Sequence, residues 1–164
     1  MPVLRKLLEP NAQQYAASKG IKLSRFLGDG NDGAVWESSR DTAVKALERS
    51  ASYEREREAY LRLANQGITD IAGFAVPLLI DTDDTLKIVE MAIVFPPCVL
   101  DFAKSYVDHP PEFSPEVIAE WEERTAELFG DDWPVVETIL AWLRTYGIHY
   151  FDARPGNIRF RNNE

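Results

Sequence analysis

The chain has 164 residues, of which 45% are hydrophobic, and it carries a formal net charge of −9. This length and hydrophobic content suit one domain, or two small lobes that share a core, and exclude global disorder. The acidic balance, with no cluster of Lys and Arg, excludes the basic face of a nucleic-acid-binding protein and disfavours anionic membranes as partners. The single cysteine, Cys98, excludes an internal disulfide and is typical of a reducing compartment.

Targeting and membrane segments are not expected. The N-terminus lacks the long apolar stretch of a signal peptide. The most apolar run, 91–100, is too short to span a bilayer and is broken by Pro96 and Pro97. We therefore expect a cytoplasmic protein with no nucleic acid and no membrane among its partners.

The first half of the chain is predicted to be rich in strands. Helix stop signals and alternating apolar patterns predict helices at 11–19 and 50–65, and strands at 21–27, 34–38, 42–47, 74–80 and 86–94. Ser50 or Ser52 is a candidate cap for the second helix, and Gly67 is its stop signal.

The second half is predicted to be mostly helical. Helices are expected at 100–107, 115–129 and 134–146, and a short strand at 158–160. Ser114 followed by Pro115 is typical of a helix N-terminus. The fold class predicted is therefore α+β: a first lobe with an antiparallel sheet and one inserted helix, a proline-marked hinge, and a minimal helical second lobe. Clefts between lobes are common ligand sites.

A glycine-rich loop occupies residues 28–35 and contains Gly28, Gly30, Gly33 and Val35. Glycines are ordinary turn residues, so the pattern alone favours a plain turn. However, the residues after this loop are predicted to form a strand, whereas a dinucleotide-binding fingerprint would open a helix. A glycine loop between two strands is typical of a hairpin that covers nucleotide phosphates.

Lys45 ends a β-branched and apolar run, and a lysine there is commonly a solvated strand-edge residue. Its functional interpretation is a phosphate-binding lysine that pairs with a helix glutamate. Glu56 is favoured for that pairing because it shares one helix face with Tyr60 and Leu63 at spacings of four and three.

Residues 147–158 form the most specific stretch, in which Asp152 and Asn157 stand five apart around a Pro-Gly turn. Asp152 can orient or deprotonate a hydroxyl, and Asn157 can hold a divalent cation. Arg154 stands between them and can neutralise a transferring phosphate. The alternative is a plain turn, because Asp, Asn, Pro and Gly are all turn formers.

Taken together, these motifs resemble the protein-kinase-like superfamily, its small-molecule kinases included. The loop fits G-x-G-x-x-G-x-V, residues 43–45 fit the strand lysine motif, and residues 152–157 fit the D-x-x-x-x-N of the catalytic loop. The chain is similar to short, C-terminally truncated bacterial kinase-like proteins that lack the D-F-G segment. The resemblance spans about residues 21–160.

The resemblance implies three segments: an N-terminal helical extension at 1–20, a kinase-like N-lobe at 21–95 and a truncated C-lobe at 96–164. It implies ATP and Mg²⁺ as cofactors, and the backbone at 91–95 as the adenine-binding hinge. The implied catalytic residues are Asp152, Arg154 and Lys45, with Asn157 as metal ligand. The implied nucleotide-binding residues are Gly28, Gly30, Gly33, Val35, Lys45, Glu56 and Met91.

The sequence also departs from that family. Tyr150 and Phe151 replace His-Arg, Arg154 stands where Lys is usual, and no D-F-G follows Asn157. Asp29 and Asp32 stand in the glycine loop, where they would repel phosphates or cap backbone amides. Three functions therefore remain open. One is an ATP-dependent phosphotransferase, serine/threonine-kinase-like and of reduced activity. Another is a pseudokinase-like module that binds a nucleotide or a protein partner without chemistry. The third is a plain interaction protein whose kinase-like shape is an inherited scaffold.

Overall fold

A computed structural model describes residues 2–161 of the chain. The helices are α1 (Pro2–Lys19), α2 (Ser50–Asn65), α3 (Pro115–Phe129), a 3₁₀ turn (Gly130–Asp132) and α4 (Trp133–Thr145). The strands of the first half are β1 (Leu23–Asp29), β2 (Gly33–Ser38), β3 (Thr42–Leu47), β4 (Asp70–Ile71), β5 (Phe74–Ala75), β6 (Leu79–Asp83) and β7 (Ile88–Ala92). The remaining strands are β8 (Cys98–Val99), β9 (Ser105–Val107), β10 (Ile148–Tyr150) and β11 (Ile158–Arg159).

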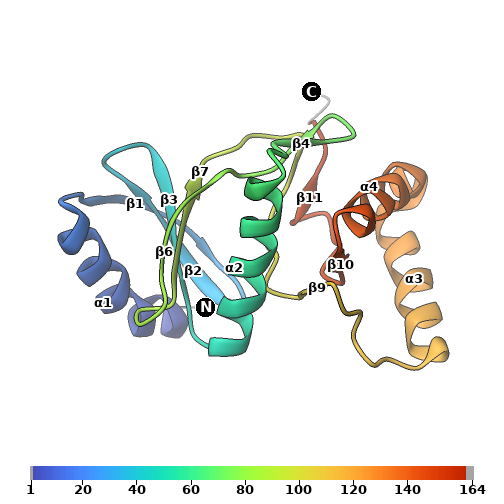
Figure 1. The fold of residues 1–164 in the computed structure, drawn as a ribbon, viewed down its shortest axis with the longest axis horizontal. Helices are drawn as coiled ribbons and strands as arrows, with labels where there is room; N and C mark the ends of the chain where they lie inside the picture. Colours follow the sequence, from blue (N-terminus) through green and yellow to red (C-terminus); the bar gives the residue numbers. More distant parts are fainter. Residues whose placement is uncertain (1, 162–164) are drawn as a thin grey trace.

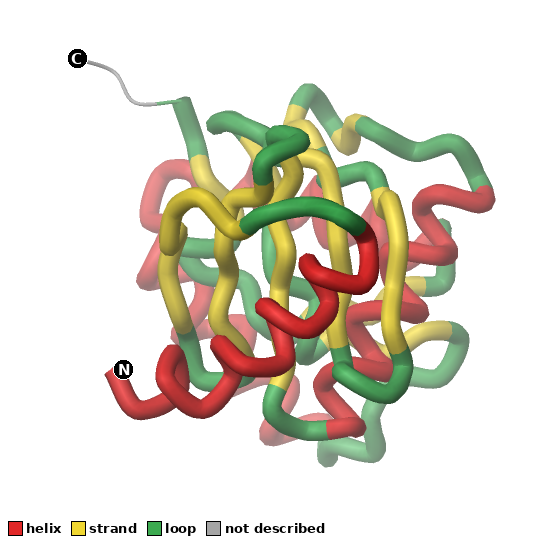
Figure 2. Tube along the Cα trace, turned by 90° about the vertical axis from the view of Figure 1, so that its left-hand side faces the viewer, coloured by secondary structure: helices red, strands yellow, loops and turns green. Residues whose placement is uncertain are grey.

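The first half is built on an antiparallel five-stranded sheet in the order β1-β2-β3-β7-β6. Helix α1 crosses one face of this sheet, as Figure 2 shows, and α2 stands on the other side (Figure 1). Every residue of β3 is buried because successive side chains point to opposite faces and both faces are covered. Val44 and Ala46 belong to the core under α1, whereas Ala43 and Leu47 belong to the main core.

The second half is smaller and less regular. Two of its short strands join β5 and β4 of the first half in a four-stranded sheet of order β11-β8-β5-β4. The other two, β9 and β10, form a pair beside which α3 and α4 stand (Figure 1). The Ser114 hydroxyl accepts a hydrogen bond from the Val117 amide at the start of α3, which confirms the predicted N-cap. No helix within residues 2–161 is long and apolar enough to cross a membrane.

Helix α2 joins the two halves through Arg62, near its C-terminal end. The Arg62 guanidinium donates to both carboxylate oxygens of Asp108, at 2.8 and 2.6 Å, and to the Tyr146 carbonyl at 2.9 Å. Gly147 makes room for this contact, since a Cβ built there would lie 2.5 Å from an Arg62 nitrogen. The position of α2, and of every residue it carries into the cleft, is therefore tied to the second half.

The α+β fold class and most elements predicted from the sequence are confirmed, but the helix expected at 100–107 is wrong. Asp101 and Asp108 have φ of 62° and 67°, outside the helical region. The Leu100 carbonyl accepts from the Tyr150 hydroxyl, and the Lys104 carbonyl accepts from the Phe151 amide. These tertiary partners replace the i−4 bonds that a helix would make.

Three smaller differences concern α1, α2 and a tryptophan. Helix α1 begins at Pro2 rather than at 11 and continues through Pro10, because apolar residues on one of its faces pack on the sheet. Helix α2 begins after Arg49, with no side-chain cap from Ser50 or Ser52. Trp142 lies on the helix predicted at 134–146, where an aromatic side chain is expected to pack in the helical core, but it is 49% exposed.

Candidate functional site

A cavity of about 650 Å³ opens between the sheet and the second half of the chain. Its walls come from the β1–β2 loop, β3, α2, the end of β7 with the following linker, and the turn after β10. The lining residues predicted from the sequence are Gly28, Gly30, Gly33, Val35, Lys45, Glu56, Met91, Arg154 and Asn157. Asp152 is not among the lining residues.

The three glycines of the loop differ in why they are glycines. Gly28 has a φ of 151°, which side chains rarely adopt. A Cβ at Gly33 would lie 2.4 Å from the Ala46 carbonyl oxygen, so Gly33 is needed for the close approach of β2 and β3. Gly30 has open space around it, and its amide donates to the Gly33 carbonyl at 3.0 Å, which closes the turn.

Asp32 of the glycine loop contacts the start of α2. The Asp32 carboxylate accepts from the Ser52 hydroxyl at 3.1 Å, and the Asp32 carbonyl accepts from the Glu48 amide at 3.0 Å. The Asp32 side chain thus ties the loop to the first turn of α2. Asp29 lines the cavity.

Lys45 reaches from β3 into the cavity wall and meets two carboxylates. Its Nζ atom lies 2.9 Å from each carboxylate oxygen of Glu56 and 3.4 Å from the Asp101 carboxylate. The Lys45 and Glu56 side chains are 8% and 0% exposed, whereas Asp101 is 21% exposed. Asp101 is therefore the member of this cluster that faces the cavity most openly.

The three charged groups of this cluster shift one another's pKa values. Burial lowers the pKa of Lys45, but the Glu56 and Asp101 charges outweigh it and raise that pKa. Burial raises the pKa of Glu56 to about 7 against the opposing pull of Lys45. Burial also opposes ionisation of Asp101, yet Lys45 and the Ala103 amide hold its pKa below the ordinary value. With two acids around one base, the cluster favours a proton on Glu56.

The turn after β10 places Asp152, Arg154 and Asn157 together. The Asn157 side-chain amide donates to the Asp152 carbonyl at 2.9 Å, and the Asn157 backbone amide donates to the Arg154 carbonyl at 2.8 Å. The Leu100 amide donates to the Asn157 carbonyl at 2.7 Å, which fixes the turn against the linker. These bonds account for an Asx-rich turn and also direct Asn157 into the cavity wall.

Asp152 is 9% exposed and loosely paired. Its Oδ1 atom lies 3.8 Å from Arg154 Nε and 4.0 Å from Lys104 Nζ, and its Oδ2 atom has no hydrogen-bond partner within residues 2–161. Burial, and then repulsion from Asp101, raise the pKa of Asp152 against the pull of Arg154 and Lys104. A carboxylate with a raised pKa and a spare oxygen is suited to accept a proton.

The donors for Mg²⁺ are few. No group of three His, Cys, Asp or Glu side chains placed to hold a metal occurs within residues 2–161. The cavity nevertheless presents the Asp101 carboxylate and the Asn157 side chain, and the unpartnered Asp152 oxygen belongs to the same turn as Asn157. Mg²⁺ is commonly held by one or two protein oxygens together with substrate phosphates. The donor set fits that shared mode and not an all-protein cage.

Part of the cavity lining is apolar. Val35, Ala43 and Met91 line it from β2, β3 and β7, and the linker residues 92–96 complete the wall. The Met91 side chain is 5% exposed, and Met91 pairs with Ala43 across the sheet. The flat, apolar ring of a nucleotide base fits such a slot, where backbone groups of the linker would lie at the edge of the ring.

Sequence reasoning missed four residues that contribute charge to this site. Asp101 was placed in a helix that does not form, and nothing in the local pattern links it to Lys45. Arg25 and Arg159 line the cavity, and Lys104 lies beside Asp152. An aspartate just after an apolar, proline-broken linker was the one available signal for Asp101.

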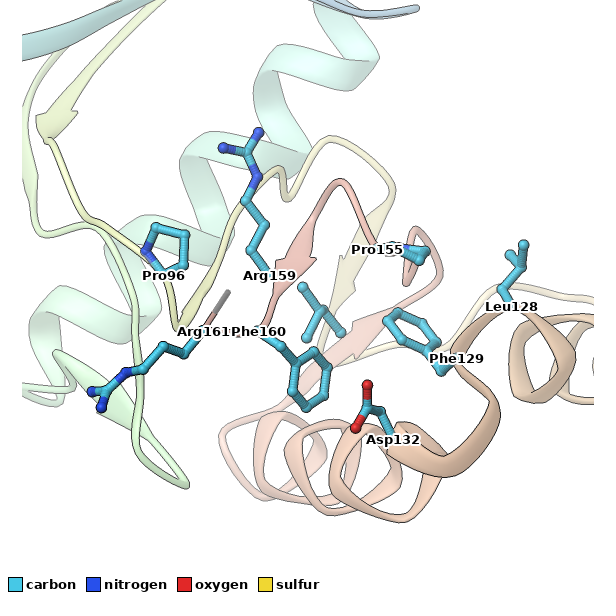
Figure 3. A pocket seen from close by; sticks show the side chains of 9 residues that line it. Pro96, Leu128, Phe129, Asp132, Pro155, Arg159, Phe160 and Arg161 are labelled. Atoms are coloured by element: carbon cyan, nitrogen blue, oxygen red, sulfur yellow. The ribbon is translucent and has the colours of Figure 1, made fainter. Parts of the chain in front are cut away.

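A second cavity, of about 490 Å³, is formed between the end of α3 and β11 (Figure 3). It shares Pro96 and Arg159 with the cleft, and no predicted site residue lines it. Phe129 and Phe160 lie close together in its wall, with ring centroids 6.4 Å apart. Its chemistry is that of an apolar floor with arginines at the rim.

Comparison with known proteins finds similar solved structures but no matching family. No family model and no curated protein matches the chain. Among solved structures, it is similar to a streptomycin–ATP complex of APH(2'')-IIa, with 17% identity and a TM-score of 0.41 over 80% of this chain and 39% of that one. An ADP-bound aminoglycoside phosphotransferase, APH(2'')-Ib, has 20% identity and a TM-score of 0.39 over 71% and 38%.

A gentamicin complex of APH(2'')-IIa has 19% identity and a TM-score of 0.42 over 77% of this chain and 36% of that one. The chain thus spans well under half the length of these neighbours. At these values the similarity carries no argument about activity, which is left to the geometry of the cleft.

Proposed function

We propose that the cleft binds a nucleoside triphosphate and supports ATP-dependent phosphotransfer. One observation carries the proposal: a single cavity is lined by the glycine turn, by the buried Lys45–Glu56 pair and, opposite them, by Asn157 and Arg154. The base would occupy the slot beside Met91, and the phosphates would extend under the glycine turn toward Lys45. Charged and amide groups from both halves then converge on the phosphate end.

Each residue has a defined part in the proposed transfer. Lys45, held by Glu56, binds phosphate oxygens, and Arg154 neutralises charge on the transferring group. Asp152 takes the proton of an acceptor hydroxyl, and the oxygen of that hydroxyl bonds to the terminal phosphorus of the nucleotide. At the same time the bond from that phosphorus to the bridging oxygen breaks, and the nucleoside diphosphate leaves. A bound Mg²⁺, held by Asn157 with substrate phosphates, would supply charge neutralisation there.

The experiment is a binding measurement followed by a transfer assay. Thermal unfolding is recorded with ATP, ADP, GTP and no ligand, each with and without Mg²⁺, and transfer of the labelled terminal phosphate to the chain or to a lysate is then followed. We expect a rise in Tm with a nucleotide, and transfer that Asp152→Asn abolishes. The absence of any shift with every nucleotide would refute binding.

A second candidate is a nucleotide-binding module without transfer. It is favoured by the contact between Asp101 and Lys45, in which the carboxylate charge compensates the positive charge of the lysine. The two candidates separate cleanly in the same assay. A nucleotide-dependent Tm rise with no labelled product, unchanged by Asp152→Asn, selects the binding module. Turnover that Lys45→Met abolishes selects the phosphotransferase.

A further inference from the structure

Within residues 2–161, Lys45 forms ion pairs with two carboxylates, those of Glu56 and Asp101. The Asp101 carboxylate lies 3.4 Å from Lys45 Nζ and faces the cavity. A phosphate that approached Lys45 from the cavity would meet Asp101 first. Two anions at such a distance repel strongly where water is partly excluded.

The position of Asp101 is fixed by its surroundings and is not an incidental loop conformation. Phe102, which is fully buried, packs edge-on between the rings of Tyr60 and Tyr150, with centroid distances of 5.0 and 5.3 Å. The Ala103 amide donates to the Asp101 carboxylate at 3.3 Å. Anchored by the next two residues, the carboxylate is held at the cavity wall.

An unsatisfied oxygen lies in the same neighbourhood. The Oδ2 atom of Asp152, a residue nine-tenths buried, has no hydrogen-bond partner within residues 2–161. Burial, and then repulsion from Asp101, raise the pKa of Asp152. Two carboxylates that repel each other, one lacking a partner, gain most from a cation that arrives with the ligand.

We propose that Asp101 couples phosphate binding in this cleft to a divalent cation. Its carboxylate occupies the place on Lys45 that a bare phosphate would take, and it supplies an oxygen ligand to the cation that neutralises the phosphate. The inference rests on the proposed function and names the residue that sets its ligand specificity.

The test is isothermal titration calorimetry of the full chain with adenosine, ADP, ATP and inorganic pyrophosphate, each in EDTA and in Mg²⁺. We expect wild type to bind ADP and ATP at least about tenfold more tightly with Mg²⁺ than without it. Asp101→Asn should lose that gain and bind bare ADP and pyrophosphate at least about tenfold more tightly than wild type does. Adenosine affinity should not change.

The variants are chosen to keep the fold. Asn accepts the Ala103 hydrogen bond and tolerates the φ of 62° at this position. Asp41→Asn is the matched control, because Asp41 has a φ of 60° on the exposed turn between β2 and β3, away from the cleft. It should behave as wild type in every titration. Adding Lys45→Met to Asp101→Asn should remove the gain in bare phosphate binding.

The outcomes separate the inference from the proposed function. Suppose that Asp101→Asn keeps the wild-type dependence of nucleotide affinity on Mg²⁺ and binds bare ADP and pyrophosphate no more tightly than wild type. That result overturns the role of Asp101 and leaves nucleotide binding standing. Pyrophosphate binding gained by Asp101→Asn, with no binding of adenosine or any nucleotide to either protein, supports the role of Asp101 and sinks the nucleotide proposal.

Discussion

Two charged clusters lie on opposite faces of the same pair of strands, β3 and β7. On the face under α1, Glu90 accepts hydrogen bonds from Tyr15 at 2.6 Å, from Thr42 at 2.6 Å and from Arg40 at 2.7 Å. On the cleft face, Lys45 meets Glu56 and Asp101. Both clusters contain a fully buried carboxylate, since the Glu90 and Glu56 side chains are each 0% exposed.

The two clusters differ in what surrounds them. Each Glu90 oxygen has at least two donors, all from this chain, and α1 covers the network. The cleft cluster faces a cavity of about 650 Å³ and lies near an Asp152 oxygen that lacks a partner within the described residues. A saturated polar network stabilises a fold, whereas an unsaturated one beside a cavity is a candidate ligand site.

The largest expected effect is on the cluster of Lys45, Glu56 and Asp101 on the cleft face. Lys45→Met should lower nucleotide affinity or phosphotransfer about 100-fold or more, because it removes the cation aimed at the phosphates. The fold should survive, since Glu56 can take up a proton when its partner is lost. Calorimetric titration with Mg²⁺-ADP measures the loss, and the exposed Lys22→Met is the matched control. Unchanged binding would contradict the assignment of Lys45.

The opposite outcome, a loss of stability without a loss of nucleotide affinity, is expected for the Glu90 cluster under α1. Glu90→Gln keeps the side-chain volume but removes the charge that Arg40, Thr42 and Tyr15 share. The free energy of unfolding should fall by about 1–3 kcal/mol, the usual cost of weakening several charge-assisted hydrogen bonds. Nucleotide affinity should not change. Urea unfolding combined with the same titration distinguishes this from a variant that damages the cleft.

A third prediction concerns the tie between α2 and the second half. Gly147→Ala should lower stability by about 1–3 kcal/mol, because φ is 80° there and a Cβ would collide with the Arg62 guanidinium. Displacing Arg62 should also loosen α2 and weaken nucleotide binding. Gly73→Ala, at a φ of 86° with open space around it, is the matched control, because it shares the backbone strain and lacks the collision. Equal unfolding midpoints for the two variants would count against the tie.

The smallest effect expected is a pH dependence of opposite sign at the two clusters. Burial raises the pKa of Glu56 to about 7, above its ordinary 4.5, so the folded protein binds that proton more tightly than the unfolded chain does. The Glu56 contribution to stability is therefore full below pH 4.5 and lost as the pH rises through 7. Glu56→Gln should flatten this part of the stability profile.

Glu90 should act the other way. Burial alone would raise its pKa, but the bonds from Arg40, Thr42 and Tyr15 outweigh burial and lower it. The contribution of Glu90 to the free energy of unfolding is present above the ordinary pKa of a glutamate. That contribution is lost as the pH falls through the lowered pKa of Glu90 in the folded protein. Urea denaturation of Glu56→Gln and Glu90→Gln across the acidic range tests both signs. Identical slopes in the two variants would show that the clusters titrate alike.

The sequence predicts the first half well because local patterns decide it. The alternation in β2 and β3, the face that Glu56 shares with Tyr60, and the glycine punctuation all act over a few residues. The Lys45–Glu56 contact follows from those patterns. The role of Lys45 in binding a nucleotide remains a prediction, as do the roles of Asp152 and Asn157.

The second half was harder to predict because tertiary contacts override its local pattern. Residues 100–107 are rich in apolar and helix-tolerant side chains, yet Phe102 is drawn between Tyr60 and Tyr150 and the backbone bonds go to β10. The contribution of Asp101 to the cleft depends on that rearrangement. The Glu90 network is likewise formed from residues as far apart as Tyr15 and Glu90, so no short motif encodes it.

Cys98 offers a built-in chemical reporter on this molecule. The chain's single thiol is fully buried in β8, paired with β11 on one side and β5 on the other. Alkylating reagents can reach it only when those short strands separate. The speed of labelling in native buffer therefore gives a site-resolved measure of how often the smaller half opens, without any added dye or engineered probe.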